Sequence, residues 1–237
     1  MKYVVSFADG VGHYAKAMMR LELSLRQVGF GGETERFKGV NDYAHIGSPF
    51  HKGAPTAVPY AFKALSIKKA MEDGARYILW CDSVVYATKS IAPVWKHIEE
   101  HGYLLFDNIG FSIGDYTSDA CLAHWGMTRE EAFESKMLMA CVMGFDTEHQ
   151  DTKVFLQRYI HAATDGVSYP GDWHNNNLQV SNDMRVKGHR HDQSVASIIA
   201  KQMRLNITNA QQTYFAYAQH KGIVPIADGV CLWSEGI

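Results

Sequence analysis

One run of residues, Tyr77 to Ser83, constrains the fold of this chain more than any other. Five apolar or aromatic residues in a row end abruptly at a carboxylate, Asp82. A run this apolar is typical of a central strand that is covered on both faces. In open α/β sheets, ligands bind just beyond the carboxyl ends of such strands, and a carboxylate there can hold a hard cation against phosphate oxygens. The simpler alternative is that Asp82 only caps a turn.

Strand-like and helical segments alternate along the rest of the chain. Apolar runs predict strands over residues 4–7, 77–81, 103–106, 138–145 and 205–207. Helical spacing predicts helices over residues 14–28, 59–74 and 94–101, from 151 onward and around 195–203. This alternation predicts a three-layer α/β domain with a mainly parallel central sheet. We expect one domain over residues 1–237, with a long loop over 165–190 and a closing flap over 211–237.

The composition excludes several classes of protein. With 46% hydrophobic and 20% charged residues, the chain is typical of a globular protein. Its formal net charge is −2 and it has no basic run, which argues against a broad nucleic-acid-binding surface. The four cysteines lack metal-like spacing and are interpreted as reduced, buried thiols. No segment suits a signal peptide or a membrane span, so we expect a cytoplasmic protein.

Two further patterns are weaker. The turn Asp9-Gly10-Val11-Gly12 lies between a strand and a helix, as a nucleotide-binding turn would, but it has neither the Rossmann nor the Walker pattern. A plain tight turn explains it about as well. His97 and His101 share one helix face, but no third ligand is nearby in the sequence. A solvated face is therefore favoured over a zinc site.

The segment His189 to Ser194 is the second informative pattern. A polar loop ends in Asp192 where a helix begins, which is also the favoured position for a helix cap. A cap does not need the preceding His189, Arg190 and His191, and such a group suits an anionic or polyhydroxyl ligand. Near the C-terminus, His220-Lys221 is interpreted as surface when taken alone.

Taken in order, these segments resemble nucleotide-sugar glycosyltransferases of the GT-A fold. Among these, the chain is most similar to bacterial and viral polysaccharide- or capsule-type transferases. The resemblance extends from about Tyr3 to His220. Its carriers are Tyr60-Ala61-Phe62-Lys63-Ala64, Leu79-Trp80-Cys81-Asp82-Ser83-Val84-Val85, Ser90-Ile91-Ala92-Pro93-Val94-Trp95, Tyr116-Thr117-Ser118-Asp119 and His189-Arg190-His191-Asp192-Gln193-Ser194.

The chain departs from the family at its metal motif, usually Leu-Trp-Leu-Asp-x-Asp-Val, because Val84 stands where the second carboxylate is expected. The resemblance implies that Mn²⁺ or Mg²⁺ is held by Asp82, and His220 is the best match for a second ligand near the C-terminus. Imidazole favours Mn²⁺ over Mg²⁺. The alternative is an enzyme without a metal, in which Lys63, Arg190 or Lys221 stabilises the leaving diphosphate.

The resemblance also implies roles for the other matched residues. Asp192, with His191, is the predicted catalytic group at the sugar face, and retention is slightly favoured over inversion. The residues predicted to bind the nucleotide-sugar, with a UDP-type donor favoured, are Asp9, Tyr14, Lys63, Asp82, Ser83, Arg190, Gln193 and Lys221. The residues predicted to bind the hydroxyl acceptor, a glycan or a modified nucleic-acid base, are Thr117, Asp119 and Trp173.

Two other functions stay open at this stage. A sugar nucleotidyltransferase uses a similar sheet, but its first turn is expected to carry Arg or Lys, and Asp9-Gly10-Val11-Gly12-His13 has neither. A non-catalytic module that binds a nucleotide or a sugar would account for Val84.

Overall fold

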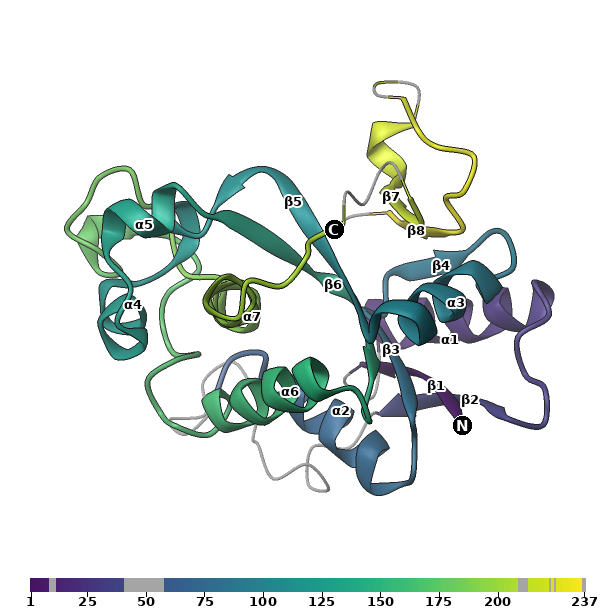
Figure 1. Ribbon diagram of the computed structural model, residues 1–237. Coiled ribbons are helices and arrows are strands. Elements are labelled where there is room, and N and C mark those ends of the chain that lie inside the picture. The colour runs from purple at the N-terminus through teal and green to yellow at the C-terminus, as the bar shows by residue number, and fades with distance from the viewer. Residues whose placement is uncertain (9–11, 41–57, 209–212, 222, 224, 236–237) are drawn as a thin grey trace.

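A computed structural model describes residues 1–8, 12–40, 58–208, 213–221, 223 and 225–235, except the side chains of Val40 and His220. Its main sheet has five strands in the order β2-β1-β3-β6-β5 (Figure 1). The strands are β1 (Lys2–Phe7), β2 (Glu35–Val40), β3 (Tyr77–Cys81), β5 (Tyr103–Ser112) and β6 (Lys136–Asp146). A smaller sheet of order β4-β8-β7 contains β4 (Val85–Ala87), β7 (Phe215–Tyr217) and β8 (Leu232–Ser234).

The main sheet is mainly parallel, as predicted. Strands β2 and β3 both pair in parallel with β1. Strand β6 runs antiparallel to β3 and to β5, so β5 points in the same direction as β1, β2 and β3. The predicted central strand, residues 77–81, is the middle strand of the sheet. The apolar sequence did not indicate which strand is reversed, because a strand buried on both faces has the same composition in either direction.

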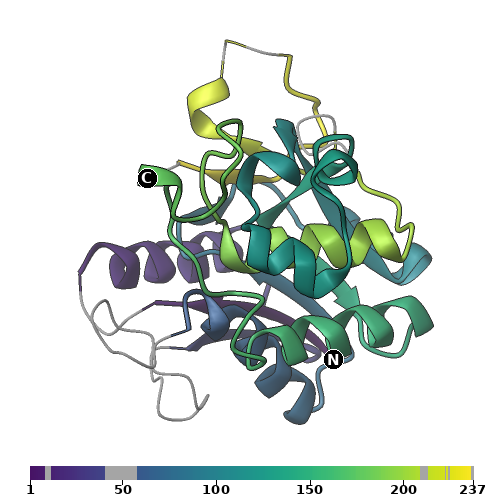
Figure 2. The same ribbon diagram turned by 90° about the vertical axis from the view of Figure 1, so that its left-hand side faces the viewer.

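Helices cover both faces of this sheet. They are α1 (His13–Gln27), α2 (Ala61–Glu72), α3 (Ala92–His101), α4 (Asp119–Trp125), α5 (Arg129–Phe133), α6 (Gln150–Ala162) and α7 (His191–Gln202). In Figure 1, α2 and α6 lie on one side of the sheet and α1 and α3 on the other. Figure 2, like Figure 1, shows α7 above α6. The chain therefore has the three layers that the alternation predicted.

The position of strand β3 between two layers of helices explains why its sequence is apolar without interruption. Ile78 and Trp80 belong to the hydrophobic cluster under α2, α6 and α7. Leu79 and Cys81 alternate with them and belong to the cluster under α1 and α3. All four are fully buried. Because side chains of a strand point alternately to its two faces, a strand covered on both must be apolar at every position.

The sequence prediction failed at one strand and missed several short elements. Residues 205–207 form no strand; Thr208 makes an isolated bridge to Phe106 instead. Helices α4 and α5 and the small sheet were not predicted. A sequence signal for α5 was present, since Thr128 and Glu131 form a capping box at its start. The remaining short elements are too brief for a periodicity.

In the residues that the structure describes, the predicted long loop over residues 165–190 and the predicted C-terminal flap over 211–237 contain little regular structure. Residues 165–190 hold one short 3₁₀ turn, Asn176–Leu178, and otherwise no regular element. In the C-terminal segment, β8 pairs with both β4 and β7. Flap closure and the single-domain boundary stay predictions. Among the described residues, no helix is both long enough and apolar enough to cross a membrane; the cytoplasmic location also stays a prediction.

Candidate functional site

Asp82 stands at the carboxyl end of the middle strand with its backbone held on two sides. Its N–H donates to the Cys141 carbonyl of β6 at 2.8 Å, and its own carbonyl accepts the Val85 N–H at 2.9 Å, which closes the turn into β4. Its side chain is 33% exposed. The Trp80 indole Nε1–H donates to Asp82 Oδ1 at 2.7 Å. The carboxylate therefore faces a neighbouring indole and partly solvent, and it does not cap its own turn.

Lys63, from the first turn of α2, links Asp82 to Asp192. Its Nζ lies 3.1 Å from Asp82 Oδ1 and 2.8 Å from Asp192 Oδ2. It also donates to the Ala140 carbonyl of β6 at 2.7 Å. An ammonium has three N–H donors, so these three acceptors satisfy it fully. The structure thus brings together two carboxylates that the sequence analysis singled out separately, and it joins them through one cation.

Two of the three groups in this cluster, Lys63 and Asp192, are almost entirely buried. Lys63 is 2% exposed and Asp192 is 3% exposed. Burial by itself would lower the pKa of Lys63, but Asp192 and Asp82 raise it above its ordinary value, so Lys63 is a cation. Burial raises the pKa of Asp192, and Lys63 opposes that shift. The Tyr159 hydroxyl completes the surroundings of Asp192 by donating to Oδ2 at 3.4 Å.

The helix-cap alternative for Asp192 does not match the structure. The residue at the N-cap position of α7 is Arg190, not Asp192, and the Arg190 side chain makes no capping hydrogen bond. The Asp192 carboxylate is turned instead toward Lys63 of α2 and Tyr159 of α6. An acid this deeply buried needs such partners, because an unpaired buried charge is strongly destabilising.

His191 and Tyr60 stack on each other at the starts of the two helices that carry Asp192 and Lys63. Their ring centres are 5.2 Å apart and nearly parallel. Both residues have left-handed backbones, with φ of 47° and 60°. That conformation is costly for a residue with a side chain, and such residues cluster at functional sites. The His191 Nδ1–H donates to the Tyr169 carbonyl at 2.9 Å, and burial lowers the pKa of His191 to about 4. The ring is therefore neutral near pH 7.

Arg190 packs against two aromatic rings beside this stack. Its guanidinium carbon lies 3.7 Å from the centre of the Trp173 ring and 4.2 Å from that of Tyr116. Trp173 stacks in turn on Tyr60, with ring centres 5.8 Å apart, and is 42% exposed. Arg190 was predicted to bind the donor and Trp173 to bind the acceptor. In the structure both are direct neighbours of His191 in one continuous group.

The other predicted residues are spread more widely. Gln193 points into the fold and donates to the Leu138 carbonyl at 2.7 Å, and Ser83 is buried in the turn after β3. Tyr14 and Lys221 are exposed. Asp9 and the side chain of His220 lie outside the described residues.

The two predicted acceptor residues Thr117 and Asp119 are engaged within the chain. The buried Thr117 hydroxyl donates to the Ile113 carbonyl at 2.7 Å. Asp119 accepts from the Ser181 hydroxyl at 2.7 Å and from the Asn182 N–H at 3.1 Å, and it pairs with Arg129. These contacts tie the loop over 165–190 to α4 and α5. They do not support an acceptor role, which for both residues stays a prediction.

His189, which the sequence analysis grouped with Arg190 and His191 as suited to a ligand, is instead fully buried and holds the same loop. His189 accepts the Ser118 N–H at Nδ1, 3.2 Å away, and its Nε2–H donates to the Ser168 carbonyl at 3.1 Å. Burial lowers the pKa of His189 to about 3. Tyr159 was missed as a site residue, because it reads as an ordinary core residue of an apolar helix. No sequence pattern marks its role, which arises from a contact between distant segments.

A metal ion would find few protein ligands at this site. Across the described parts of the chain, no group of three or more His, Cys, Asp or Glu is placed to hold one. Asp82 uses Oδ1 for Trp80 and Lys63, and Oδ2 makes no hydrogen bond or ion pair with a described residue. One free carboxylate oxygen fits a hard cation such as Mg²⁺, which takes most of its ligands from water and substrate phosphates. It does not make a complete protein site.

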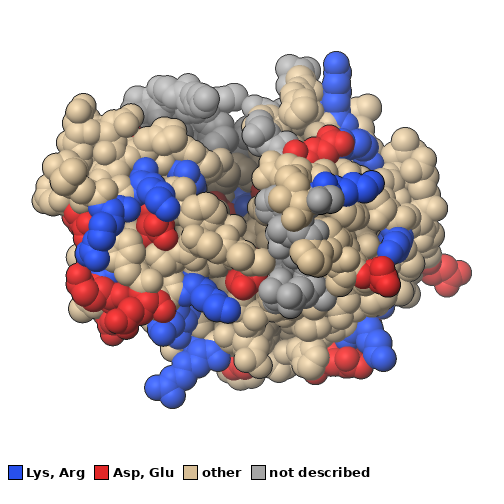
Figure 3. Space-filling model, turned by 90° about the horizontal axis from the view of Figure 1, so that it is seen from above, with Lys and Arg blue, Asp and Glu red and all other residues tan. Residues whose placement is uncertain are grey.

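Figure 3 shows the face seen from above Figure 1. The surface is hollowed between two halves of the molecule, and basic and acidic atoms are visible inside the hollow.

Comparison with solved structures identifies this architecture. The structure of mouse xyloside xylosyltransferase 1 in its apo form matches with a TM-score of 0.54 at 8% identity, over 99% of this chain and 97% of that one. A glycosyltransferase involved in the glycosylation of the major capsid of PBCV-1 matches with a TM-score of 0.57 at 12% identity, over 99% and 93%. The chain has a GT-A fold.

The match to the GT-A fold extends over nearly the whole chain, in agreement with the resemblance of its motifs. No protein-family model and no curated protein matches the sequence. At these low identities the likeness establishes the fold. The function must be argued from the site.

Proposed function

We propose that this GT-A-fold protein transfers a sugar from a nucleotide-diphosphate donor, favoured to be of the UDP type, to a hydroxyl group of an acceptor. The observation that carries the proposal is the ion cluster Asp82–Lys63–Asp192 at the carboxyl end of the middle strand. Ligands of open α/β sheets bind at this edge. Solved glycosyltransferases with the same fold support the choice of reaction.

Asp82 forms the donor end of the proposed site. When the bond between the anomeric carbon and the phosphate oxygen breaks, negative charge grows on the leaving diphosphate. A divalent cation bound at Asp82 Oδ2, with His220 as the predicted second ligand, would neutralise that charge. Asp82 orients that oxygen because Trp80 and Lys63 hold Oδ1. Lys63 itself is buried, and all three of its N–H donors already have acceptors. We therefore assign to Lys63 the role of holding the two carboxylates in place.

Asp192 forms the sugar face of the proposed site. Positive charge grows at the anomeric centre in the transition state, and a fixed carboxylate stabilises it. Asp192 Oδ2 is already engaged by the Lys63 ammonium and the Tyr159 hydroxyl, so that oxygen is not free to take a proton from an acceptor hydroxyl. This favours a stabilising role for Asp192 over removal of the acceptor proton, and it supports retention. His191 would fix the start of α7 through its stack on Tyr60.

The decisive experiment measures the turnover of a panel of nucleotide-sugars, with and without Mn²⁺, by the wild-type protein and two variants. Asp82→Asn and Asp192→Asn should each lower turnover by orders of magnitude. Asp151→Asn is the matched control, because Asp151 is an exposed aspartate in the first turn of α6. Full activity in chelator would remove the metal from the proposal.

Other results of this experiment point to the two alternative functions. Binding of a nucleotide-sugar without any turnover, in the presence of glycan acceptors, would indicate a non-catalytic module. Formation of the nucleotide-sugar from a sugar phosphate and a nucleoside triphosphate would indicate a nucleotidyltransferase. Wild-type turnover in both Asn variants would contradict the assignment of the site.

A further inference from the structure

Arg190 is a rigidly held cation at the wall of the site. Its planar guanidinium packs on Trp173 and Tyr116, with ring centres 3.7 and 4.2 Å away, and its Nη1 donates to the Trp173 carbonyl. A guanidinium carries five N–H donors that point outward in its plane. When rings cover its faces, the group is oriented in advance for an acceptor that approaches its edge.

No carboxylate of the described residues pairs with Arg190, unlike the cations around it. Arg129 pairs with Asp119, Arg185 with Asp183, and Lys187 with Asp115. Arg190 is partly buried, and burial lowers its pKa. Charged groups removed from water are normally matched by an opposite charge. An anionic ligand would supply the charge that the protein does not.

The contacts of Arg190 place this anion beside the residues of the candidate site. On one side, Arg190 packs on Trp173, which stacks on Tyr60. Tyr60 in turn stacks on His191, the residue before Asp192. On the other side, Arg190 packs on Tyr116, which ends the 3₁₀ turn Gly114–Tyr116 before α4. Trp173 adds a partly exposed indole, which suits the apolar face of a sugar ring. A cation beside such a ring is suited to an acidic sugar.

We propose that the acceptor is acidic and that Arg190 binds its carboxylate or phosphate group. This inference rests on the proposed glycosyl transfer and adds the chemical class of the acceptor. The planar fork of Arg190 would form paired hydrogen bonds with the anionic group, while Trp173 contacts the sugar ring. The acceptor hydroxyl would then lie toward Asp192.

The test compares matched acidic and neutral acceptor probes. Methyl glucuronide and methyl glucoside differ by one carboxylate, and methyl glucoside 6-phosphate supplies the phosphate form. Dissociation constants are measured by ligand-observed NMR in the presence of UDP, and transfer is measured with each active donor. The wild-type protein should prefer at least one acidic probe by about 10- to 100-fold, the typical effect of charged hydrogen bonds.

Three variants isolate the guanidinium. Arg190→Gln should remove most of the preference by weakening only the acidic probe. Arg190→Lys, which keeps the charge but loses the fork, should retain part of it. Arg158→Gln is the matched control, because Arg158 also packs on an indole, 5.0 Å from the Trp125 ring centre, and pairs with no described carboxylate. It should keep the wild-type preference. Thermal melting confirms that each variant is folded.

Several outcomes would overturn the proposal. One is a wild-type protein that binds neither acidic probe or shows no preference for them. Another is an Arg190→Gln variant that keeps the preference for the acidic probe but binds UDP more weakly than the wild type by a similar factor. That result would assign Arg190 to the donor diphosphate. The binding measurement needs no catalysis. A lack of turnover with every donor would therefore count against the proposed function, while the acid preference would still be decided.

Discussion

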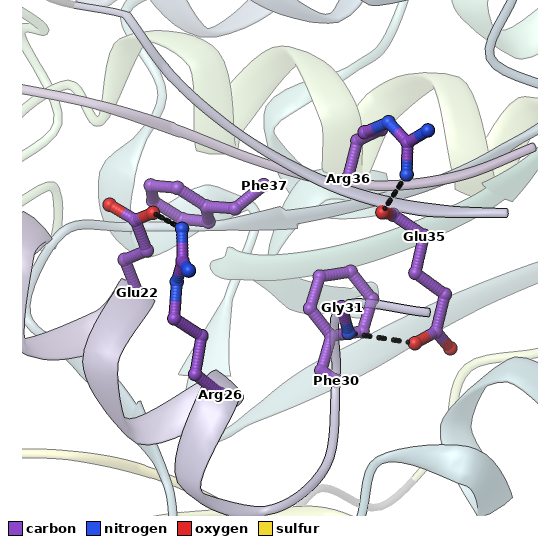
Figure 4. A pocket seen from close by; sticks show the side chains of 7 residues that line it. All are labelled: Glu22, Arg26, Phe30, Gly31, Glu35, Arg36 and Phe37. Atoms are coloured by element: carbon purple, nitrogen blue, oxygen red, sulfur yellow. Dashed lines mark hydrogen bonds and ion pairs between the residues drawn. The ribbon is translucent and has the colours of Figure 1, made fainter. Parts of the chain in front are cut away.

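The two ends of the main sheet both carry charged groups, but they differ in how the charges are held. At the carboxyl end, Lys63 joins Asp82 and Asp192 in a nearly buried cluster. At the amino end, where β2 begins, a pocket of about 370 Å³ is lined by Glu22, Arg26, Phe30, Gly31, Glu35, Arg36 and Phe37 (Figure 4).

Among the described residues, the charges of the amino-end pocket interact only with close neighbours in the sequence. Arg26 pairs with Glu22 one helical turn away, and Glu35 accepts the Gly31 N–H at 2.9 Å. The Arg26 side chain is 70% exposed. Such pairs contribute little to stability, because water competes for both partners. In contrast, the Lys63 contact with Ala140 joins positions 77 residues apart inside the protein. The comparison teaches that burial and long-range connection, rather than a hollow, distinguish the candidate site.

The largest expected effect is the removal of the buried cation. Lys63→Met keeps the length of the side chain but leaves two carboxylates without their partner. Breaking a buried ion pair in this way typically costs about 3–5 kcal/mol of unfolding free energy. Urea denaturation measures the loss.

A double variant serves as the control for this measurement. Lys63→Met combined with Asp192→Asn should be less destabilised than the sum of the two single variants, because the pair is removed together. A Lys63→Met variant as stable as the wild type would show that the cluster is not an energetic link, and the contrast between the two ends would fail.

An intermediate effect is expected on acidification, through His189. Burial holds its folded-state pKa at about 3, below the value of about 6.5 for an unfolded histidine. The unfolded chain therefore binds more protons, and this part of the stability is lost as the pH falls from about 6.5 toward 3. Between pH 7.5 and 5 we expect His189 alone to account for a loss of about 2 kcal/mol.

Unfolding at a series of pH values, in the wild type and in His189→Gln, measures this loss. The variant should be less stable at pH 7.5 but should depend less on pH in this window. Equal slopes in the two proteins would contradict the assignment. His191, whose pKa burial lowers to about 4, should leave a residual slope of the same sign in the variant.

The smallest effect is expected at the amino-end pocket. Arg26→Gln removes an exposed pair within one helix, so the free energy of unfolding should change by about 0.5 kcal/mol or less. Donor turnover should be unchanged. A loss of turnover in this variant would show that the amino-end pocket contributes to function, and the distinction drawn between the two ends would have to be abandoned.

Much of the fold could be predicted from local sequence, and part of the site as well. The uninterrupted apolar run of Tyr77 to Cys81 predicted a central strand, and it lies in the middle of the sheet. The motifs around Asp82 and Asp192 were recognised as candidates before any contact was known. The reversed direction of β6 and the elements α4, α5, β4, β7 and β8 were not predicted. Short segments carry too few residues for a pattern, and strand direction leaves no trace in composition.

By itself, the sequence determined the longer buried segments such as Tyr77 to Cys81, because apolar spacing over several residues is a local property. It also determined where polar groups interrupt those segments, at Asp82 and at residues 189–192. Only the tertiary structure decided which of these groups meet. Lys63 was predicted to bind the nucleotide-sugar, but only the structure shows that it is the cation between the two carboxylates. Arg190 and Asp192 are close in sequence, but their surroundings differ. Arg190 packs on aromatic rings and pairs with no carboxylate of the described residues, whereas Asp192 is buried against the Lys63 ammonium. Charge pairing depends on distances between segments far apart in the chain, and only packing sets those distances.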